Sequence, residues 1–237
     1  MSRDFELLQR AGMEQGIFSS LASSVASSVE EKPKRFHPIS EEVHELANAV
    51  RRLFLTPTRS STVRTVLFVG VGNGDGNSWI CAGAAKSLAS QVEKRVCVVD
   101  ANHRHPSLHR HFGVENNRGF WDHVTDNSPL KSSCRQVADS NLWLLACGGS
   151  TLSHETLLHA DSLRERVEEL GQEFSYVLLD APPVDNFGET EALGAFVDGV
   201  ILVVGEMSTR RDMAQKAKEK LDGAGVRLLG AILNKRA

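Results

Sequence analysis

The sequence predicts an α/β protein with a doubly wound, mostly parallel sheet that is flanked by helices. Short, almost continuously apolar runs alternate with helical stretches, as expected for strands that are buried on both faces. A glycine-rich turn follows the first run and leads directly into a helix, and acidic residues end two later runs. Because such sheets bind ligands at the carboxyl ends of their strands, we expect the functional site at that edge.

Length and composition favour one soluble, cytoplasmic domain. The chain has 237 residues, of which 41% are hydrophobic, and this is enough for one substantial core. Its net charge of -3 gives no general attraction to nucleic acid, so we expect no nucleic-acid partner. No run reaches the roughly 18 apolar residues of a membrane span, and the charged N-terminus lacks a secretory signal. The four cysteines form no C-x-x-C pair, which favours reduced thiols.

The N-terminal part is predicted to be separate from the domain. Residues 3–16 can form a short amphipathic helix, which is either a frayed end or a docking helix for a partner. Residues 18–38 are rich in serine and then in charge, which is typical of a linker. We therefore divide the chain into residues 1–38, an N-terminal helix and Ser-rich linker, and residues 39–237, a P-loop nucleotide-binding domain.

Within the domain, Ser40 can cap a first helix that ends near Pro57. The apolar runs predict strands over residues 65–69, 95–100, 142–145, 176–180, 200–204 and 228–233. Helical periodicity predicts helices over residues 78–92, 161–172 and 208–223. This alternation is the pattern of βαβ units.

The glycine-rich turn has the sequence G-V-G-N-G-D-G-N-S over residues 70–78. Glycines allow a tight turn whose backbone N–H groups point inward, and the following helix N-terminus favours phosphate. The last three residues stand where a P-loop has G-K-[ST], so Asn77 replaces the lysine. The Ser78 hydroxyl is placed to bind magnesium. The predicted nucleotide-binding residues of this turn are Gly72, Asn73, Gly74, Asp75, Gly76, Asn77 and Ser78.

Asp100 and Asp180 each end a predicted strand. Phosphoryl transfer needs backbone donors for phosphate, a hydroxyl and a carboxylate for metal, and an acid near the attacking group. We therefore expect Ser78, Asp100 and Asp180 to be metal ligands and Asp100 to be catalytic. Each acid alone could instead cap the next helix.

Three motifs in this order resemble those of the bacterial tyrosine kinases of capsule and exopolysaccharide synthesis, which are relatives of the MinD/ParA-type P-loop ATPases. The family's G-x-x-P-x-x-G-K-[ST] loop matches Gly70, Gly76 and Ser78. Its D-x-D-x-R-x-P motif matches Asp100, Arg104 and Pro106, followed by S-L-H, and its D-x-P-P motif begins at Asp180. The similarity covers about residues 38–235. It implies a MinD/ParA-like P-loop NTPase fold, with Arg104 and Asn234 in nucleotide binding.

The chain departs from the family at residues that bear on function. Asn77 replaces the P-loop lysine, and Asn102 replaces the second acid of D-x-D. The family's E-x-x-R-x-x-R oligomerisation pattern keeps Glu41 but has His44 and Ala47 in place of arginines. The single tyrosine, Tyr176, falls in a predicted core strand, so we expect no autophosphorylation of a tyrosine-rich tail.

The resemblance implies ATP or ADP with Mg²⁺ as cofactors, and an inner-membrane polysaccharide chain-length regulator or co-polymerase as partner, with homo-oligomers as a further expectation. We expect a degenerate kinase that senses nucleotide or regulates exopolysaccharide synthesis and export, and that reaches the membrane only through its partner. The first alternative is an active protein-tyrosine autokinase or ATPase that borrows a lysine such as Lys86 or one from a neighbouring subunit. The second is a MinD/ParA-type positioning ATPase.

Overall fold

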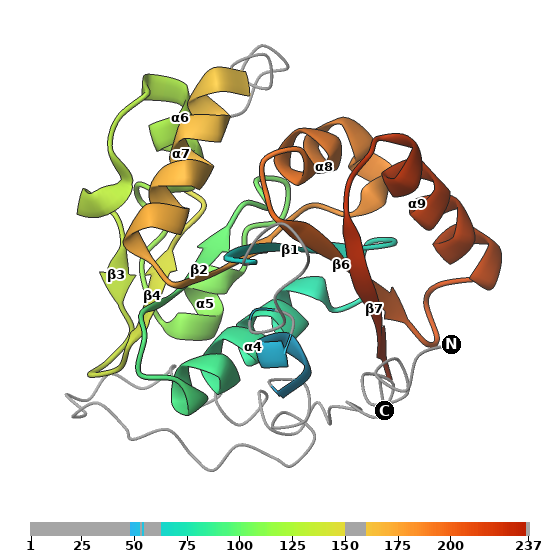
Figure 1. Ribbon diagram of the computed structural model, residues 1–237, viewed down its shortest axis with the longest axis horizontal. Coiled ribbons are helices and arrows are strands. Elements are labelled where there is room, and N and C mark those ends of the chain that lie inside the picture. Colours follow the sequence, from blue (N-terminus) through green and yellow to red (C-terminus); the bar gives the residue numbers. More distant parts are fainter. Residues whose placement is uncertain (1–47, 53, 55–62, 150–159, 236–237) are drawn as a thin grey trace.

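The structure, a computed structural model, describes residues 48–52, 54, 63–149 and 160–235 (Figure 1). The predicted N-terminal helix, the linker, the domain boundary at residue 38 and the comparison at Glu41 lie outside these residues. Of the helix predicted between Ser40 and Pro57, residues 48–52 and 54 are described, and they are helical.

The described part of the chain is built on one sheet in the order β3-β4-β2-β5-β1-β6-β7. Its strands are β1 (Thr65–Gly70), β2 (Val96–Asp100), β3 (Arg135–Gln136), β4 (Leu142–Leu145), β5 (Tyr176–Asp180), β6 (Gly199–Gly205) and β7 (Leu228–Asn234). All neighbouring strands are parallel except β3 and β4. The predicted mostly parallel sheet is therefore confirmed.

Helices cover both faces of the sheet, as Figure 1 shows. Helices α4 and α5 lie on one face, and α6, α7, α8 and α9 lie on the other. The helices are α4 (Asn77–Gln91), α5 (Leu108–Phe112), α6 (Phe120–Asp126), α7 (Ala160–Glu173), α8 (Phe187–Gly194) and α9 (Arg211–Gly223), with 3₁₀ turns at Leu130–Ser132 and Val184–Asn186.

Each strand supplies side chains to two cores, because successive residues of a strand point to opposite faces. In β1, Val66 and Phe68 pack on the side of α4, whereas Leu67 and Val69 pack on the opposite side. All four are completely buried. Burial on both faces explains why the strands appear in the sequence as continuous apolar runs rather than as alternating patterns.

The structure differs from the sequence prediction at the start of α9. The helix was expected from residue 208 but begins at Arg211. Ser208 and Thr209 instead donate their hydroxyls to Asp75 of the glycine-rich turn, at 2.6 and 2.7 Å. Contacts with a residue 133 and 134 positions away in the sequence therefore keep Ser208 and Thr209 in a loop.

Candidate functional site

The glycine-rich turn lies at the carboxyl end of β1, in the centre of the sheet. Gly74 and Gly76 have φ angles of 87° and 81°, a left-handed conformation that glycine adopts readily. Gly76 precedes the first residue of α4. The first N–H groups of a helix have no intrahelical partner, so this end of α4 offers donors and a positive dipole end to an anion.

Asp75 anchors the turn to the other half of the sheet. Its carboxylate is buried and accepts hydrogen bonds from Gly72 N at 2.9 Å and from the Ser208 and Thr209 hydroxyls. The side-chain amide of Asn234, at the end of β7, donates to the carbonyl of Asp75 at 2.8 Å. Asn234 was predicted to bind nucleotide, and in the structure it holds the turn.

Asn77, which replaces the lysine, turns its amide toward the ends of β1 and β5. Its Nδ2 donates to Asp180 Oδ1 at 2.6 Å, Phe68 O at 2.9 Å and Ala181 O at 3.2 Å. Its Oδ1 is buried and has no hydrogen-bond partner among the described residues. The amide group therefore fastens the helix start to the strand ends and brings no positive charge to the turn.

Of the two acids that end strands, Asp180 is the one that is hydrogen-bonded to the turn, through Asn77. It is completely buried at the end of β5, where it is the register partner of Phe68 on one side and of Asp100 on the other. Burial and the neighbouring Asp100 raise the pKa of its carboxyl well above the usual value, against the lowering effect of Ser78 and Asn77. Its Oδ2 accepts no hydrogen bond from the part of the chain described.

Asp100 is also completely buried, but both of its oxygens are occupied. Oδ2 accepts the N–H groups of Ser107 and Leu108 at 2.9 Å each, and Oδ1 accepts that of Asn102 at 3.2 Å. Burial raises the pKa of this carboxyl to about 6, although the three backbone hydrogen bonds lower it. Asp100 thus holds the loop after β2 and the first turn of α5.

The residues at the turn fit a magnesium ion when nucleotide phosphates complete its ligands. The Asp180 and Asn77 oxygens without partners, together with the neighbouring Ser78 hydroxyl, are the oxygen ligands that Mg²⁺ prefers. Within the described residues, no group of three His, Cys, Asp or Glu side chains could hold a metal by itself. A magnesium ion here would therefore depend on phosphate oxygens and water, as is common for this ion.

Arg104, predicted to bind nucleotide, is engaged by a residue that the sequence did not single out. Its guanidinium lies against Glu189 of α8, with NH2 2.5 Å from Oε1, and this bond raises the pKa of Arg104. Glu189 is buried, whereas the Arg104 side chain is 42% exposed. His103 Nδ1 lies 3.6 Å from the same carboxylate. The loop after β2 is thereby tied to α8.

The structure brings together the predicted turn, Asp100 and Asp180 at one edge of the sheet. Asn73 and Gly74 form the exposed crest of the turn, while Gly72, Gly76, Asn77 and Ser78 are partly exposed. Sequence reasoning missed Glu189, Ser208 and Thr209. Their only signal was polarity near a strand end or a helix start, which many surface residues share.

Comparison with known proteins identifies the family to which the chain belongs. A family model described as cellulose biosynthesis protein BcsQ matches residues 63–224, which span the sheet from the start of β1 to α9. The chain belongs to the BcsQ family. This member of the BcsQ family is also 29% identical over 172 residues to tyrosine-protein kinase YwqD of Bacillus subtilis, covering 73% of the chain and 72% of the relative. Tyrosine-protein kinase CpsD of Streptococcus agalactiae is 23% identical over 197 residues, covering 83% and 85%. The resemblance to bacterial tyrosine kinases is confirmed.

Solved structures confirm the MinD/ParA-like fold of this BcsQ-family chain. The kinase domain of the Escherichia coli tyrosine kinase ETK superposes with a TM-score of 0.79 at 18% identity, covering 94% of this chain and 88% of that one. The septum site-determining protein MinD of Pyrococcus horikoshii, complexed with Mg-ADP, gives a TM-score of 0.59 at 21% identity, covering 72% and 69%. In the described part of the BcsQ-family chain, no helix combines the length and apolar character of a membrane span.

Proposed function

We propose that this BcsQ-family chain is a degenerate relative of the bacterial tyrosine kinases, a nucleotide-sensing or regulatory subunit with little phosphotransfer of its own. In this proposal the chain acts in the synthesis and export of an exopolysaccharide. The observation that carries the proposal is the position of the Asn77 amide, which is bonded to Phe68, Asp180 and Ala181 at the strand ends.

The lysine of a P-loop brings a positive charge to the β- and γ-phosphates, where negative charge develops during transfer. Asn77 is neutral, and its amide nitrogen donates to Phe68, Asp180 and Ala181 of the protein itself. Losing one preorganised donor to the transition state commonly lowers the rate about a hundred- to thousandfold. One charge-assisted hydrogen bond is worth about 1.5–3 kcal/mol in binding. The backbone donors of the turn remain, so rate suffers more than nucleotide affinity.

The cofactors of the proposal are ATP or ADP with Mg²⁺. The backbone N–H groups at the start of α4 would bind phosphate, and Ser78 and Asp180 would hold the metal. A bound Mg²⁺ would neutralise phosphate charge, which matters more where the lysine is missing. Asp100 supports this site indirectly, because its hydrogen bonds fix the loop that carries Arg104.

The partner of the proposal is an inner-membrane polysaccharide chain-length regulator or co-polymerase, and the protein would be cytoplasmic and reach the membrane through that partner. A homo-oligomer is part of the same proposal. These expectations follow the kinship with bacterial tyrosine kinases and the cellulose biosynthesis named in the family description. The burial of Tyr176 supports the expectation that the chain does not phosphorylate itself. This tyrosine is 8% exposed and packs edge-on against Phe54, with ring centroids 5.1 Å apart.

An active kinase that borrows Lys86 is less well supported by the geometry. Lys86 Nζ donates to the carbonyl of His111 at 3.2 Å and lies 4.7 Å from the centre of the Phe112 ring. The amine is therefore directed to α5. A lysine supplied by a second subunit and a positioning ATPase remain alternatives, and turnover measurements distinguish them from a sensor.

The test compares the natural chain with Asn77→Lys, by calorimetry of Mg-ATP binding and by phosphate release. We expect the natural chain to bind Mg-ATP weakly with little turnover, and Asn77→Lys to raise turnover about a hundredfold. Gln136→Lys is the matched control, because it adds the same charge on the exposed edge strand β3, outside the predicted site.

Fast hydrolysis by the natural chain that disappears in Asp180→Asn would contradict the proposal and favour an active ATPase or kinase. If the natural chain is shown by circular dichroism to be folded and still does not bind Mg-ATP at millimolar concentration, a nucleotide-sensing role is excluded. The chain would then be a scaffold protein.

A further inference from the structure

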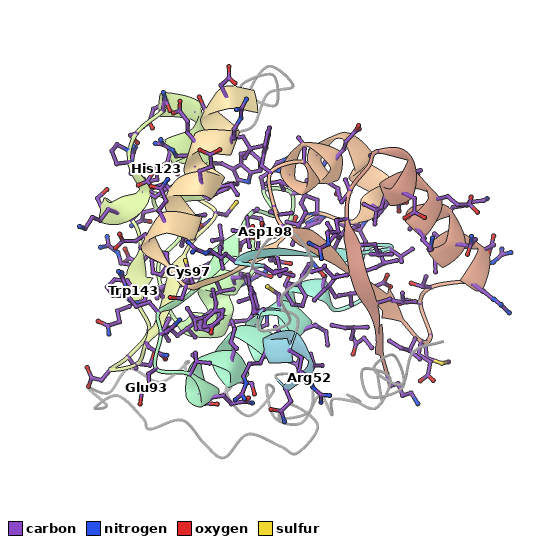
Figure 2. All side chains as sticks on the ribbon, viewed as in Figure 1. Arg52, Glu93, Cys97, His123, Trp143 and Asp198 are labelled. Atoms are coloured by element: carbon purple, nitrogen blue, oxygen red, sulfur yellow. The ribbon has the colours of Figure 1, made fainter. Side chains whose placement is uncertain are left out.

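One ion pair joins the loops that follow β2 and β5. Asp100 and Asp180, which end these two neighbouring strands, are register partners. Arg104 lies in the loop that begins after Asp100, and Glu189 lies in α8, which follows the 3₁₀ turn after β5. In Figure 1 the loop after β2 reaches toward α8, and in the same view Figure 2 shows that side chains fill the space between them. The ion pair therefore connects the two segments that lead away from the acids of the candidate site.

The guanidinium of Arg104 faces the Glu189 carboxylate with two of its nitrogens. Nε lies 3.2 Å from both carboxylate oxygens, and Nη2 lies 2.5 Å from Oε1. Arginine binds carboxylates and phosphates with this same two-point geometry. A nucleotide phosphate at Arg104 would therefore compete with Glu189 for the same two donors.

The burial of Glu189 favours the ion pair over release of the arginine. The Glu189 side chain is 6% exposed, whereas that of Arg104 is 42% exposed. A buried carboxylate is costly without a partner, because burial removes its hydration. His103 Nδ1 lies 3.6 Å from Oε2, beyond hydrogen-bond distance, and burial lowers the pKa of His103, which favours its neutral form. Within the described residues, Arg104 is thus the charged partner of Glu189.

Both segments that carry the ion pair are held in place. In the loop after β2, the carbonyl of Ala101 accepts the indole N–H of Trp121 at 3.0 Å. In α8, the Thr190 hydroxyl donates to the carbonyl of Pro182 at 3.2 Å, which ties the helix to the segment after β5. The two charged groups therefore meet in a geometry that contacts on either side maintain.

The glycine-rich turn lacks a charge that Arg104 can supply. A P-loop lysine brings a positive charge to the phosphates, and Asn77 stands in its place. A guanidinium keeps its charge at any ordinary pH and binds phosphate well. Arg104 is such a group on the loop that begins at Asp100, and the Glu189 carboxylate occupies it in this structure.

We propose that Glu189 lowers the affinity of the site for nucleoside di- and triphosphates by holding the guanidinium of Arg104 away from their phosphates. Arg104 is then the phosphate-binding residue, and Glu189 is a positioning residue that restrains it. This inference rests on the proposed function, because it requires that a nucleotide binds at the glycine-rich turn. It adds that an acid outside the predicted site sets the affinity.

Calorimetry of Mg-ATP binding to the full-length chain measures this competition. We expect Glu189→Gln to tighten binding about tenfold, because the released guanidinium gains a charge-assisted hydrogen bond to phosphate. The affinity for adenosine, which has no phosphate, should not change. Glu191→Gln is the matched control, because it removes the same charge from an exposed position of the same helix. It should change the affinity for Mg-ATP by less than about twofold, since solvent screens exposed charges.

The double variant Arg104→Gln with Glu189→Gln separates competition from simple repulsion. Removing a negative charge favours an anionic nucleotide whether or not the arginine is present, whereas release of a guanidinium requires Arg104. We therefore expect Glu189→Gln to give no gain in the Arg104→Gln background. An equal gain in that background, or no gain from Glu189→Gln in a chain that binds Mg-ATP, would overturn the inference and leave the proposed function intact.

Failure of the proposed function gives a different result. If neither the natural chain nor Glu189→Gln binds Mg-ATP at millimolar concentration, nucleotide sensing is excluded and this inference fails with it. Glu189→Asp is the second variant, in case Glu189→Gln does not fold by circular dichroism. It keeps the charge but withdraws the carboxylate by one methylene, so we expect it to tighten binding about threefold. An affinity equal to that of the natural chain would again contradict the competition.

Discussion

The ends of β2 and β5 carry the same residue in the same register, yet the two sites differ. Asp100 and Asp180 are paired across the strands, and both are completely buried. Three backbone N–H groups occupy the oxygens of Asp100. Asp180 receives one side-chain amide on Oδ1 and no described hydrogen bond on Oδ2.

This difference assigns separate roles to two acids that the sequence treats alike. A carboxylate whose oxygens are bonded by backbone N–H groups stabilises a loop, whereas one with a buried unbonded oxygen can accept a metal ion or a proton. We therefore regard Asp100 as mainly structural and Asp180 as the acid available to a ligand. Four expected outcomes, beginning with the largest, test this distinction.

The largest effect is expected for Asp100→Ala. Removing the carboxylate leaves three buried N–H groups without an acceptor, so we expect the free energy of unfolding to fall by about 3–5 kcal/mol. Urea unfolding followed by circular dichroism measures it. Asp180→Asn is the comparison, because it removes a buried acid and supplies a donor for Asn77 Oδ1, and we expect a change of less than about 1 kcal/mol. Equal losses in both variants would contradict separate roles.

The second effect concerns pH. The pKa of Asp100 is raised from 3.8 to about 6 in the folded chain, which corresponds to about 3 kcal/mol. Because the fold favours the neutral carboxyl, its contribution to stability is complete below about pH 4 and is lost as the pH rises through about 6. The difference in unfolding free energy between the natural chain and Asp100→Asn, measured from pH 4 to 7, should show this trend. A difference that is constant across the range would argue against the shifted pKa.

Asp75 is a third buried acid that can be compared with Asp100 and Asp180, and we expect its removal to have an intermediate effect on the free energy of unfolding. Its carboxylate accepts one backbone N–H and two hydroxyls, but the hydroxyls can turn to other acceptors. We expect Asp75→Ala to lower the free energy of unfolding by about 2 kcal/mol and to weaken Mg-ATP binding by loosening the turn. Asn73→Ala, on the exposed crest, is the control and should change stability by less than about 0.5 kcal/mol. Unchanged stability and Mg-ATP binding in Asp75→Ala would show that the anchor is dispensable.

The smallest effect is expected where Arg104 pairs with Glu189. The Arg104 side chain is 42% exposed, so solvent screens the pair, and Arg104→Ala should lower the unfolding free energy by about 1 kcal/mol. Glu189→Gln, which keeps the hydrogen-bonding shape, should cost less. A loss as large as that of Asp100→Ala would place Arg104 among the structural residues. Thermal unfolding of the three chains measures the order.

Much of the fold could be predicted from the sequence because it rests on local pattern. The carboxyl ends of the strands at Asp100, Leu145 and Asp180 were predicted to the residue, since continuous apolar runs end where the chain becomes polar, although β2 begins at Val96 and not at residue 95. The short helices α5 and α8 were not predicted, because five or eight residues carry too little periodicity to detect. Helix α9 begins three residues later than predicted, because Ser208 and Thr209 bond to Asp75. Asp75 is too distant in the sequence for any local pattern to reveal this contact.

The candidate site divides in the same way. The sequence by itself determined which groups meet at one edge, because the carboxyl ends of parallel strands lie together, and that Asn77 brings no charge. Only the tertiary structure decided what each group does there. Hydrogen bonds are directional and short, so the choice between a structural and an available oxygen depends on N–H groups placed by folding, as Ser107 and Leu108 are for Asp100.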